Sequence, residues 1–228
     1  MDRVLDPMQG DGLMGETRDT HFKGWARPGP VAPGHAAGTT AEPGETLDAL
    51  SGHWALFQLK DGHRFSTDDL LTAWYGSSWC PSARTVLDLG SGLGTVATIC
   101  AWRLPGARLV TVEAQSQSVA LARRSVVFNG LEPRYDIREG DFRDPGVLRD
   151  DESFDLVTGS PPYFPLGAGV ESDHAQKLAC RFELRGTVAD YCGTAARHLA
   201  PGGFFACVFP AEAAQMERVV AGAAGESG

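Results

Sequence analysis

The 228-residue sequence predicts an α/β domain built on a doubly wound, mostly parallel sheet. Short apolar strands alternate with helix-length amphipathic segments from Thr85 onward. Two of the strands are mostly apolar on both faces, which is typical of strands that helices cover on both sides. The expected strands are Thr85–Gly90, Leu109–Glu113, Tyr135–Glu139, Phe154–Gly159 and Phe204–Phe209.

Two helices are predicted between these strands. Apolar residues recur at helical spacing in Ser116–Phe128, and the following Asn129-Gly130 pair is a stop signal. The segment Thr187–Leu199 repeats the same pattern before the last strand. Because ligands bind at the carboxyl ends of parallel strands, the residues just after each strand are the candidates for function.

Composition limits the class of protein. The net charge of −9 argues against strong non-specific binding of nucleic acid by the chain as a whole. No apolar run reaches membrane-spanning length and the acidic N-terminus has no signal core, so a cytoplasmic location is expected. With no CxxC pair, the cysteines are expected to be reduced thiols rather than a disulfide framework or a metal site. They are Cys80, Cys100, Cys180, Cys192 and Cys207.

Residues 1–46 are expected to form a disordered N-terminal tail. They show no periodicity and contain turn-rich stretches such as Arg27–Pro30. Such a segment buries too little apolar surface to offset the entropy that it would lose on ordering. A single domain is therefore expected over residues 47–228.

A glycine-rich loop follows the first strand, with Asp88, Gly90, Gly92 and Gly94 at alternate positions. Glycines let the backbone turn sharply and approach a ligand where a Cβ atom would clash. The third glycine comes one position too early for the dinucleotide fingerprint, and Thr95 stands where that pattern needs Gly or Ala. No Gly-Lys-Ser/Thr follows, so neither an NAD loop nor a P-loop is predicted.

Acidic residues follow the next two strands. Glu113 closes the second strand, where a carboxylate can accept hydrogen bonds from both hydroxyls of a ribose. The third strand leads into Asp141 and Phe142. Any one of these acids can be a surface residue at a strand end. In this order and spacing, they favour a ligand with an unphosphorylated ribose.

The fourth strand runs into Ser160, Pro161, Pro162 and Tyr163. A double proline can simply end a strand, but this one falls at the expected ligand crevice. The segment resembles the Asn/Asp/Ser-Pro-Pro-Tyr motif of methyltransferases that modify amines conjugated to a planar system, and the resemblance implies the following chemistry. An amine conjugated to a planar group is a poor nucleophile because its lone pair is delocalised. Hydrogen bonds to a side-chain oxygen and a proline-fixed carbonyl favour a tetrahedral nitrogen, while an aromatic ring orients the substrate plane. Ser160, the Pro161 carbonyl and Tyr163 suit these roles.

The Asp-x-Gly-x-Gly-x-Gly loop resembles the first motif of class I S-adenosylmethionine-dependent methyltransferases, whose fold is Rossmann-like. The resemblance implies that this loop wraps the methionine end of the cofactor and that Glu113 binds its ribose. It also implies that Asp141 receives the adenine amino group and that Phe142 packs on the adenine ring. The Ser-Pro-Pro-Tyr segment is similar to the Asn/Asp/Ser-Pro-Pro-Tyr motif of methyltransferases that modify planar amines. No metal is implied.

The segment before the first strand extends the resemblance. His63–Trp74 is similar to the corresponding segment of bacterial tRNA adenine-N6 methyltransferases that modify valine tRNA. Thr67 and Asp68 match a Thr-Asp pair that covers the cofactor in that family. Asp68 can equally be read as the cap of the helix that begins there. Downstream, Ala179–Leu184 also follows the order of the family.

The resemblance favours N6-methylation of adenine in tRNA or another structured RNA. That family usually has Asn where this chain has Ser160, and the shorter hydroxyl weakens the preference for adenine. Serine at this place also occurs in cytosine-N4 enzymes. The alternatives are protein glutamine-N5 methylation, methylation of a small-molecule amine, and an inactive fold that only binds the cofactor or a partner.

The sheet is expected to lack two strands. Class I methyltransferases normally add a sixth strand and an antiparallel seventh beside the fifth, whereas this chain stops at Gly228 after one helix. The edge beside Phe204, Phe205 and Phe209 is therefore expected to be exposed and to offer unpaired backbone groups. Self-association or the addition of a partner's strand is expected at this edge.

Overall fold

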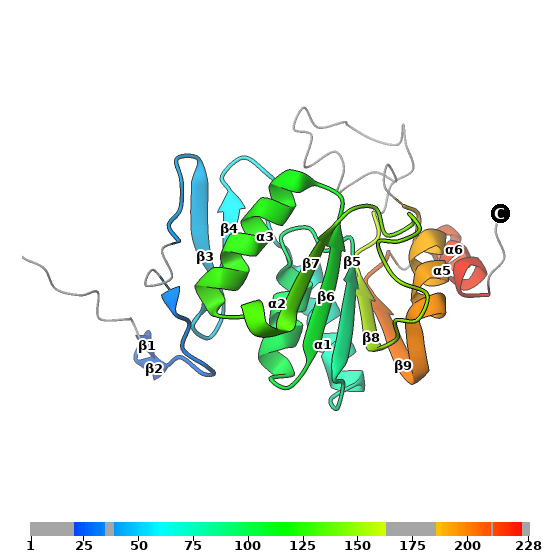
Figure 1. The fold of residues 1–228 in the computed structure, drawn as a ribbon, viewed down its shortest axis with the longest axis horizontal. Coiled ribbons are helices and arrows are strands. Elements are labelled where there is room, and N and C mark those ends of the chain that lie inside the picture. Colours follow the sequence, from blue (N-terminus) through cyan, green and yellow to red (C-terminus); the bar gives the residue numbers. More distant parts are fainter. Residues whose placement is uncertain (1–20, 35–38, 163–185, 211, 225–228) are drawn as a thin grey trace, which may run out of the picture.

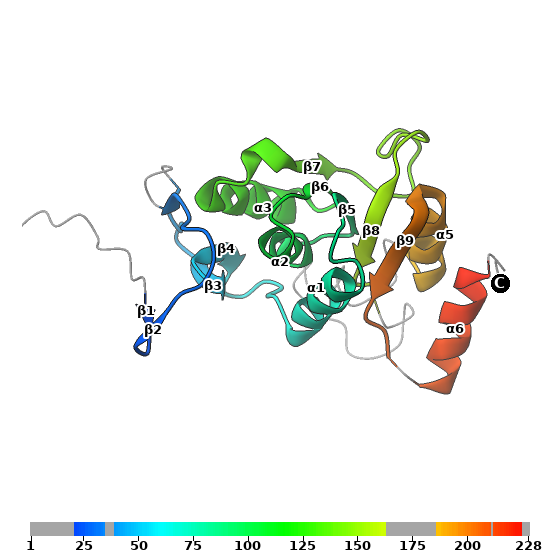
Figure 2. The same cartoon turned by 90° about the horizontal axis from the view of Figure 1, so that it is seen from below.

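The computed structural model describes residues 21–34, 39–162, 186–210 and 212–224. Its centre is a five-stranded parallel sheet in the order β7-β6-β5-β8-β9, shown in Figures 1 and 2. Within this sheet, the chain enters at the middle strand β5, adds β6 and β7 on one side, and then adds β8 and β9 on the other side. This order confirms the predicted doubly wound sheet. The strands are β5 (Thr85–Leu89), β6 (Arg108–Glu113), β7 (Tyr135–Glu139), β8 (Phe154–Gly159) and β9 (Leu199–Cys207).

The last strand differs most from the prediction. β9 begins at Leu199 rather than Phe204, because Leu199 already pairs with Phe154 before an irregularity in the register. Of the phenylalanines expected at an exposed edge, only Phe204 is largely exposed. Phe205 packs against the smaller core cluster, and the ring of Phe209 lies 5.9 Å from the Arg218 guanidinium, so the prediction of exposure is wrong for both.

Helices cover both faces of the sheet (Figure 2). The helices α1 (Thr67–Trp79), α2 (Thr95–Arg103) and α3 (Ser116–Asn129) lie on one side. On the other side lies α5 (Val188–His198), against which α6 (Ala213–Ala223) packs. A short 3₁₀ turn, η2, spans Glu132–Arg134. The bounds of α3 and α5 confirm both helices that the periodicity predicts.

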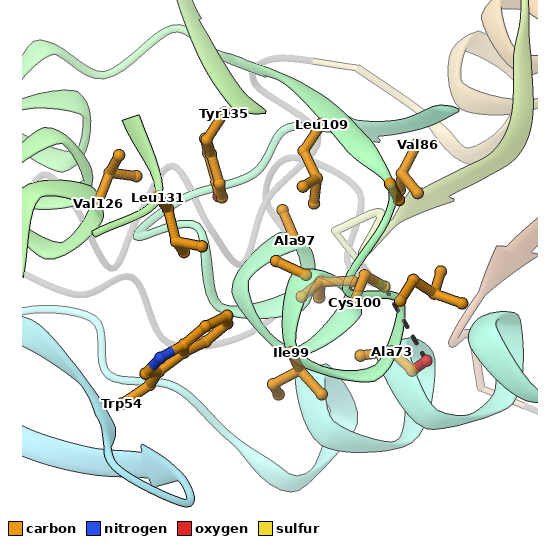
Figure 3. Close-up of a cluster of buried hydrophobic side chains, with 14 of the residues drawn as sticks. Trp54, Ala73, Val86, Ala97, Ile99, Cys100, Leu109, Val126, Leu131 and Tyr135 are labelled. Carbon is orange, nitrogen blue, oxygen red and sulfur yellow. Dashed lines mark hydrogen bonds between the residues drawn. The ribbon is translucent and has the colours of Figure 1, made fainter. Parts of the chain in front are cut away.

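Alternate residues of the central strands enter two separate cores. Val86 and Leu156 point into the larger core with α1, α2 and α3, while Leu87 and Val157 point into the smaller one with α5. All four side chains are fully buried. Figure 3 shows the larger core, where Trp54 joins it from outside the sheet. Burial on both faces explains why these strands lack the polar alternation of a half-exposed sheet.

A separate hairpin extends the domain beside α3 (Figure 1). Its strands β3 (Glu45–Ser51) and β4 (Trp54–Leu59) are joined by a two-residue turn that begins with Gly52, whose φ is 55°. Glycine at the first turn position is a known hairpin signal, although the hairpin was not among the predicted elements.

The side chains of α3 hold this hairpin in place. The backbone N–H of Ala55 donates to Asn129 Oδ1 at 3.0 Å, and Asn129 Nδ2 donates to the Ala55 carbonyl at 2.9 Å. The N–H of Phe57 donates to Ser125 Oγ at 3.0 Å. These bonds satisfy backbone groups of β4 that lie in a buried interface.

The described structure begins at residue 21, whereas the sequence predicts a disordered tail as far as residue 46. Residues 21–26 form a small hairpin of β1 (His21–Phe22) and β2 (Trp25–Ala26). Ala32 is buried in the larger core, and His53 Nε2 lies 3.1 Å from the Arg27 carbonyl oxygen. These contacts are with distant residues, so local composition does not reveal them. Residues 1–20 lie outside the described part of the chain.

Two further expectations concern the cysteines and membranes. Within the described ranges, Cys80, Cys100, Cys192 and Cys207 are all free thiols, and the first three are buried. Cys180 lies outside these ranges. In the same part of the chain, no helix combines the length and the hydrophobicity that crossing a bilayer requires.

We expect Asn129→Ala to lower the free energy of unfolding by about 2–4 kcal/mol, because both buried backbone groups of Ala55 would lose their partners. Denaturant unfolding monitored by circular dichroism would measure the loss. Gln117→Ala, at an exposed position of the same helix, is the matched control and should change stability by less than about 0.5 kcal/mol. Equal effects of the two substitutions would contradict this account of the hairpin.

Candidate functional site

A cavity of about 540 Å³ opens at the carboxyl ends of the central strands. This volume is typical of a small-molecule site, and the position agrees with the expectation for a doubly wound sheet. Its lining includes the predicted site residues Asp68, Asp88, Gly90, Gly92, Glu113, Asp141, Phe142, Ser160, Pro161 and Pro162. Thr67 and Gly94 do not line it, and Tyr163 lies outside the described residues.

The three glycines of the loop between β5 and α2 all have positive φ, between 55° and 77°. A Cβ on Gly92 would meet no atom within 4 Å, so this position faces open space in the cavity. A Cβ on Gly90 would lie 2.2 Å from the Tyr191 hydroxyl. Gly94 is the N-cap of α2, and its role in this structure is therefore to turn the chain into the helix.

Glu113, at the end of β6, holds the glycine loop. Its Oε2 accepts the N–H of Gly92 at 2.8 Å, and its Oε1 accepts the N–H of Gln115 at 2.7 Å. The carboxylate is 5% exposed and lines the cavity. Each carboxylate oxygen has a second lone pair, so the same group can still accept hydrogen bonds from a ligand.

Asp88 is a buried acid in the cavity wall. Thr158 Oγ1 donates to its Oδ1 at 2.7 Å, while Oδ2 is buried without a hydrogen-bond partner among the described residues. Burial raises the pKa of Asp88 to about 7, with the Asp69 carboxylate adding to the rise and the Thr158 hydrogen bond opposing it. Near neutral pH this site therefore exchanges readily between its charged and neutral forms.

The N-terminus of α1 brings further acids to the cavity. Ser66 is the N-cap, and its backbone N–H donates to Asp69 Oδ2 at 2.8 Å, which completes a capping box. The interpretation of Asp68 as the cap is therefore wrong; Asp68 lines the cavity instead. Burial raises the pKa of Asp69. Asp69 and His63 also line the cavity, although neither was predicted as a site residue. For Asp69, the Ser-x-x-Asp spacing of the capping box is a signal that could have indicated it.

The end of β7 supplies Asp141 and Phe142. Asp141 is paired with Arg143, whose Nη2 lies 2.6 Å from Oδ2 and whose Nε lies 2.9 Å from Oδ1. Phe142 is buried, with its ring centroid 4.6 Å from that of Tyr191 on α5. Tyr191 also lines the cavity and was not predicted, because nothing in the helical pattern of α5 separates it from a core residue.

Ser160, Pro161 and Pro162 follow β8 directly and line the same cavity. Both prolines are buried. The Ser160 hydroxyl oxygen is buried and has no hydrogen-bond partner among the described residues. The hydroxyl oxygen of Ser91 in the glycine loop is likewise buried and has no hydrogen-bond partner among the described residues. Both residues line the cavity, so a bound ligand can reach these two oxygens.

The charges around the cavity have one sign. Among the described residues that line it are five carboxylates and neither Lys nor Arg. These carboxylates are Asp68, Asp69, Asp88, Glu113 and Asp141. Such a lining favours a ligand with positive charge and disfavours phosphate groups inside the cavity.

The comparison with known families agrees with the geometry of the site. Residues 69–221 match the model of the methyltransferase small domain family, which is more than half of the chain. The chain belongs to this family. The match includes β5, the glycine loop and the segment after β8. All described lining residues of the cavity except His63, Ser66 and Asp68 lie within it.

Curated relatives of this chain are named for different methyl acceptors. It is 38% identical over 144 residues to the cypemycin N-terminal methyltransferase of a Streptomyces species, covering 62% of this chain and 49% of the relative. It is 29% identical over 151 residues to a tRNA1(Val) (adenine(37)-N6)-methyltransferase of Porphyromonas gingivalis, covering 64% and 58%. It is 39% identical over 85 residues to the release factor glutamine methyltransferase of Geobacter sulfurreducens, covering 37% and 28%.

The chain thus spans between 28% and 58% of the length of these relatives. Among solved structures, it is similar to the SAM-dependent methyltransferase of Agrobacterium tumefaciens, with a TM-score of 0.56 and 14% identity. That likeness covers 81% of this chain and 58% of the other. At this identity, the likeness establishes a shared fold.

The raised pKa of Asp88 predicts a pH dependence of stability. The folded state holds the proton up to about pH 7, whereas an unfolded aspartate loses it near pH 3.8. The stabilising contribution is therefore complete below the unfolded value and is lost as the pH rises through about 7. Wild-type protein should lose stability relative to Asp88→Asn between about pH 5 and pH 8 in denaturant titrations. If the free energies of unfolding of the two proteins changed in parallel with pH, the pKa of Asp88 would not be raised in the folded state.

Proposed function

We propose that this methyltransferase binds S-adenosylmethionine in the cavity and transfers its methyl group to a planar amine. S-adenosylmethionine supplies an electrophilic methyl group on a positively charged sulfur. The carboxylate lining suits the sulfonium and ammonium charges of this cofactor. The open space at Gly92 leaves room for a ligand against the loop backbone, where any larger side chain would intrude.

We assign the carboxylates and the aromatic ring to parts of the cofactor from the sequence motifs to which they belong. Asp88, with a buried oxygen that needs a partner, and Asp68 flank the glycine loop and would face the methionine end. Glu113, which lines the cavity at the end of β6, would accept the ribose hydroxyls. Asp141 would receive the adenine amino group while it stays paired with Arg143, and Phe142 would contact the ring.

The Ser160 hydroxyl, which is buried and has no hydrogen-bond partner among the described residues, is the observation that supports amine chemistry. It lies beside a proline-fixed carbonyl at the end of β8, in the same cavity as the glycine loop. The Ser160 oxygen and the Pro161 carbonyl can together accept both N–H groups of a planar amine. That arrangement frees the nitrogen lone pair for attack. Tyr163, from its place in the sequence, would stack on the acceptor plane.

Adenine N6 in tRNA or another structured RNA is the first acceptor that we propose. The similarity to relatives named as tRNA1(Val) adenine-N6 methyltransferases supports it. Glutamine N5 in a protein is the second acceptor, because an amide nitrogen presents the same delocalised lone pair. Its support is the 39% identity over 85 residues to a release factor glutamine methyltransferase.

Incubation with methyl-labelled cofactor and separated RNA and protein fractions tests the proposal. Label in either fraction would support methyl transfer, and its location would decide between the two acceptors. Cofactor binding without label in RNA, protein or small amines would instead favour a fold that only binds. Analysis of the labelled nucleoside or amino acid would identify the methylated atom.

We expect Ser160→Ala to lower the methylation rate by about a hundredfold while cofactor affinity stays within a few-fold, because only the acceptor loses a hydrogen bond. Ser78→Ala, at an exposed position of α1, is the control and should leave the rate unchanged. Equal losses of rate and affinity would mean that Ser160 is structural. Ser160→Asn should raise activity if the acceptor is adenine, since the amide oxygen reaches further than the hydroxyl to accept the amine N–H.

We expect Gly92→Val to abolish cofactor binding in calorimetry, because the side chain would fill space in the cavity and strain a positive φ. Gly146→Val is the matched control, since Gly146 also has a positive φ and open space but does not line the cavity. The control should bind the cofactor as wild type does. Unchanged affinity in the Gly92 variant would refute the assignment of this loop.

A further inference from the structure

The hairpin of β3 and β4 is connected to the cavity wall by the segment that leads into α1. Residues 60–66, which we name the α1 entry segment, belong to neither a helix nor a strand. In Figure 2 the chain runs directly from β4 through this segment to the helix. The segment and the first turn of α1 contribute four lining residues to the cavity, namely His63, Ser66, Asp68 and Asp69. Contacts that fix the α1 entry segment therefore also fix one wall of the cavity.

Gln58 on β4 binds the α1 entry segment directly. Its Oε1 accepts the backbone N–H of Phe65 at 2.8 Å, and its Nε2 donates to Asp48 Oδ2 at 2.9 Å. Phe65 immediately precedes Ser66, the N-cap of α1. Gln58 is fully buried, and a buried amide destabilises a protein unless its polar atoms are paired. The two hydrogen bonds thus make an amide acceptable at this position of the strand.

Asp48 on β3 completes the contact with the α1 entry segment. Arg64 Nη2 donates to its Oδ2 at 2.9 Å, and the Thr46 hydroxyl donates to the same oxygen. Burial alone would raise the pKa of this carboxyl, but the hydrogen bonds from Thr46 and Gln58 and the nearby guanidinium lower it below its ordinary value. Asp48 therefore remains a charged acceptor at neutral pH. Two adjacent residues of the segment, Arg64 and Phe65, are bonded to the hairpin.

The two ends of α1 are fixed by different parts of the molecule. In the second half of the helix, a Cβ on Gly76 would lie 3.1 Å from Ala206 Cβ and 3.2 Å from Leu156 Cδ1, so the sheet holds this part closely. At the start, the N–H of Phe65 bonds to the hairpin, and the N–H of Ser66 bonds to the first helical turn through the capping box. Two successive backbone groups thereby connect the hairpin with the turn that carries the acids.

This connection bears on the cavity because binding groups must be held accurately. A displacement of about 0.5 Å is enough to impair a designed binding site. The first turn of α1 supplies two of the five carboxylates in the described lining, Asp68 and Asp69. The hairpin that fixes this turn lies outside residues 69–221, so the family match does not include it. No residue of β3 or β4 lines the cavity itself.

We propose that Gln58 is a positioning residue of the cofactor site. Through its bond to Phe65, it sets the place of the first turn of α1, and with it the place of Asp68 and Asp69 around the methionine end of the cofactor. The inference rests on the proposed function, in which the cavity binds S-adenosylmethionine. Its consequence is that cofactor affinity depends on a buried side chain of the hairpin that does not touch the ligand.

Calorimetric titration of the full chain with S-adenosylmethionine tests this inference. Gln58→Met keeps the length of the side chain and removes its amide, and we expect at least tenfold weaker binding, because a displacement of about 1 Å can cost about a hundredfold. Leu109→Ala is the control for a general loss of stability, since Leu109 is buried near the amino end of β6, away from the cavity. Its affinity should stay within about twofold of wild type.

A rescue experiment separates the hydrogen bonds from the volume of the side chain. Gln58→Glu keeps an acceptor for Phe65 but places a second carboxylate beside Asp48, so it should also weaken binding. Adding Asp48→Asn exchanges the amide and the carboxylate between the two positions and restores a donor next to an acceptor. The double variant should bind within about threefold of wild type. Hydrogen exchange of the Phe65 amide should be at least tenfold faster in Gln58→Met than in Leu109→Ala.

The possible outcomes distinguish this inference from the proposed function. A wild-type chain that does not bind S-adenosylmethionine would refute the proposed function and this inference with it. A wild type that binds, together with equal affinity in Gln58→Met, would overturn this inference alone. Far-ultraviolet circular dichroism would show whether each variant is folded. If Gln58→Met does not fold, the double variant decides, and affinity no better than that of Gln58→Glu would overturn the role of Gln58.

Discussion

The carboxylate of Glu113 is the constraint on which the candidate site depends. By accepting the N–H of Gly92, it fastens the loop after β5 to the end of β6 across the middle of the sheet. Three glycines with positive φ give that loop a path that other residues would resist. The loop thereby leaves a cavity instead of collapsing onto the strand ends, with the buried oxygen of Asp88 in its wall.

Much of the fold could be predicted because its signals are local. Strands covered on both faces are short apolar runs, and α3 ends at Gly130, whose φ of 69° meets the need for a left-handed residue. The hairpin of β3 and β4 was missed although Gly52 offers a turn signal. What places that hairpin is its contact with Asn129 and Ser125, far away in sequence. Contacts between residues far apart in the sequence do not produce a periodic pattern of apolar residues.

The candidate site could likewise be predicted only in part. Residues directly after strands could be found, because the parallel sheet brings all those positions to one edge. Tyr191 and His63 could not, since each reaches the cavity from an element whose own pattern carries no sign of it. The pairing of Asp141 with Arg143 was likewise not anticipated. It means that both oxygens of this carboxylate already accept hydrogen bonds, in contrast to Asp88 Oδ2 and the Ser160 hydroxyl, which have no partner among the described residues.

The close packing of α1 on the sheet connects two regions of the molecule. The first turn of the helix contributes Asp68 and Asp69 to the cavity, while its later turns carry Trp74 and Trp79 on the outer surface. Gly76 packs closely against Ala206 and Leu156, so the middle of the helix has no room to approach the strands further. A larger residue at position 76 would therefore push the helix away from the sheet. Such a shift would displace the acids of its first turn together with the aromatic residues of its later turns.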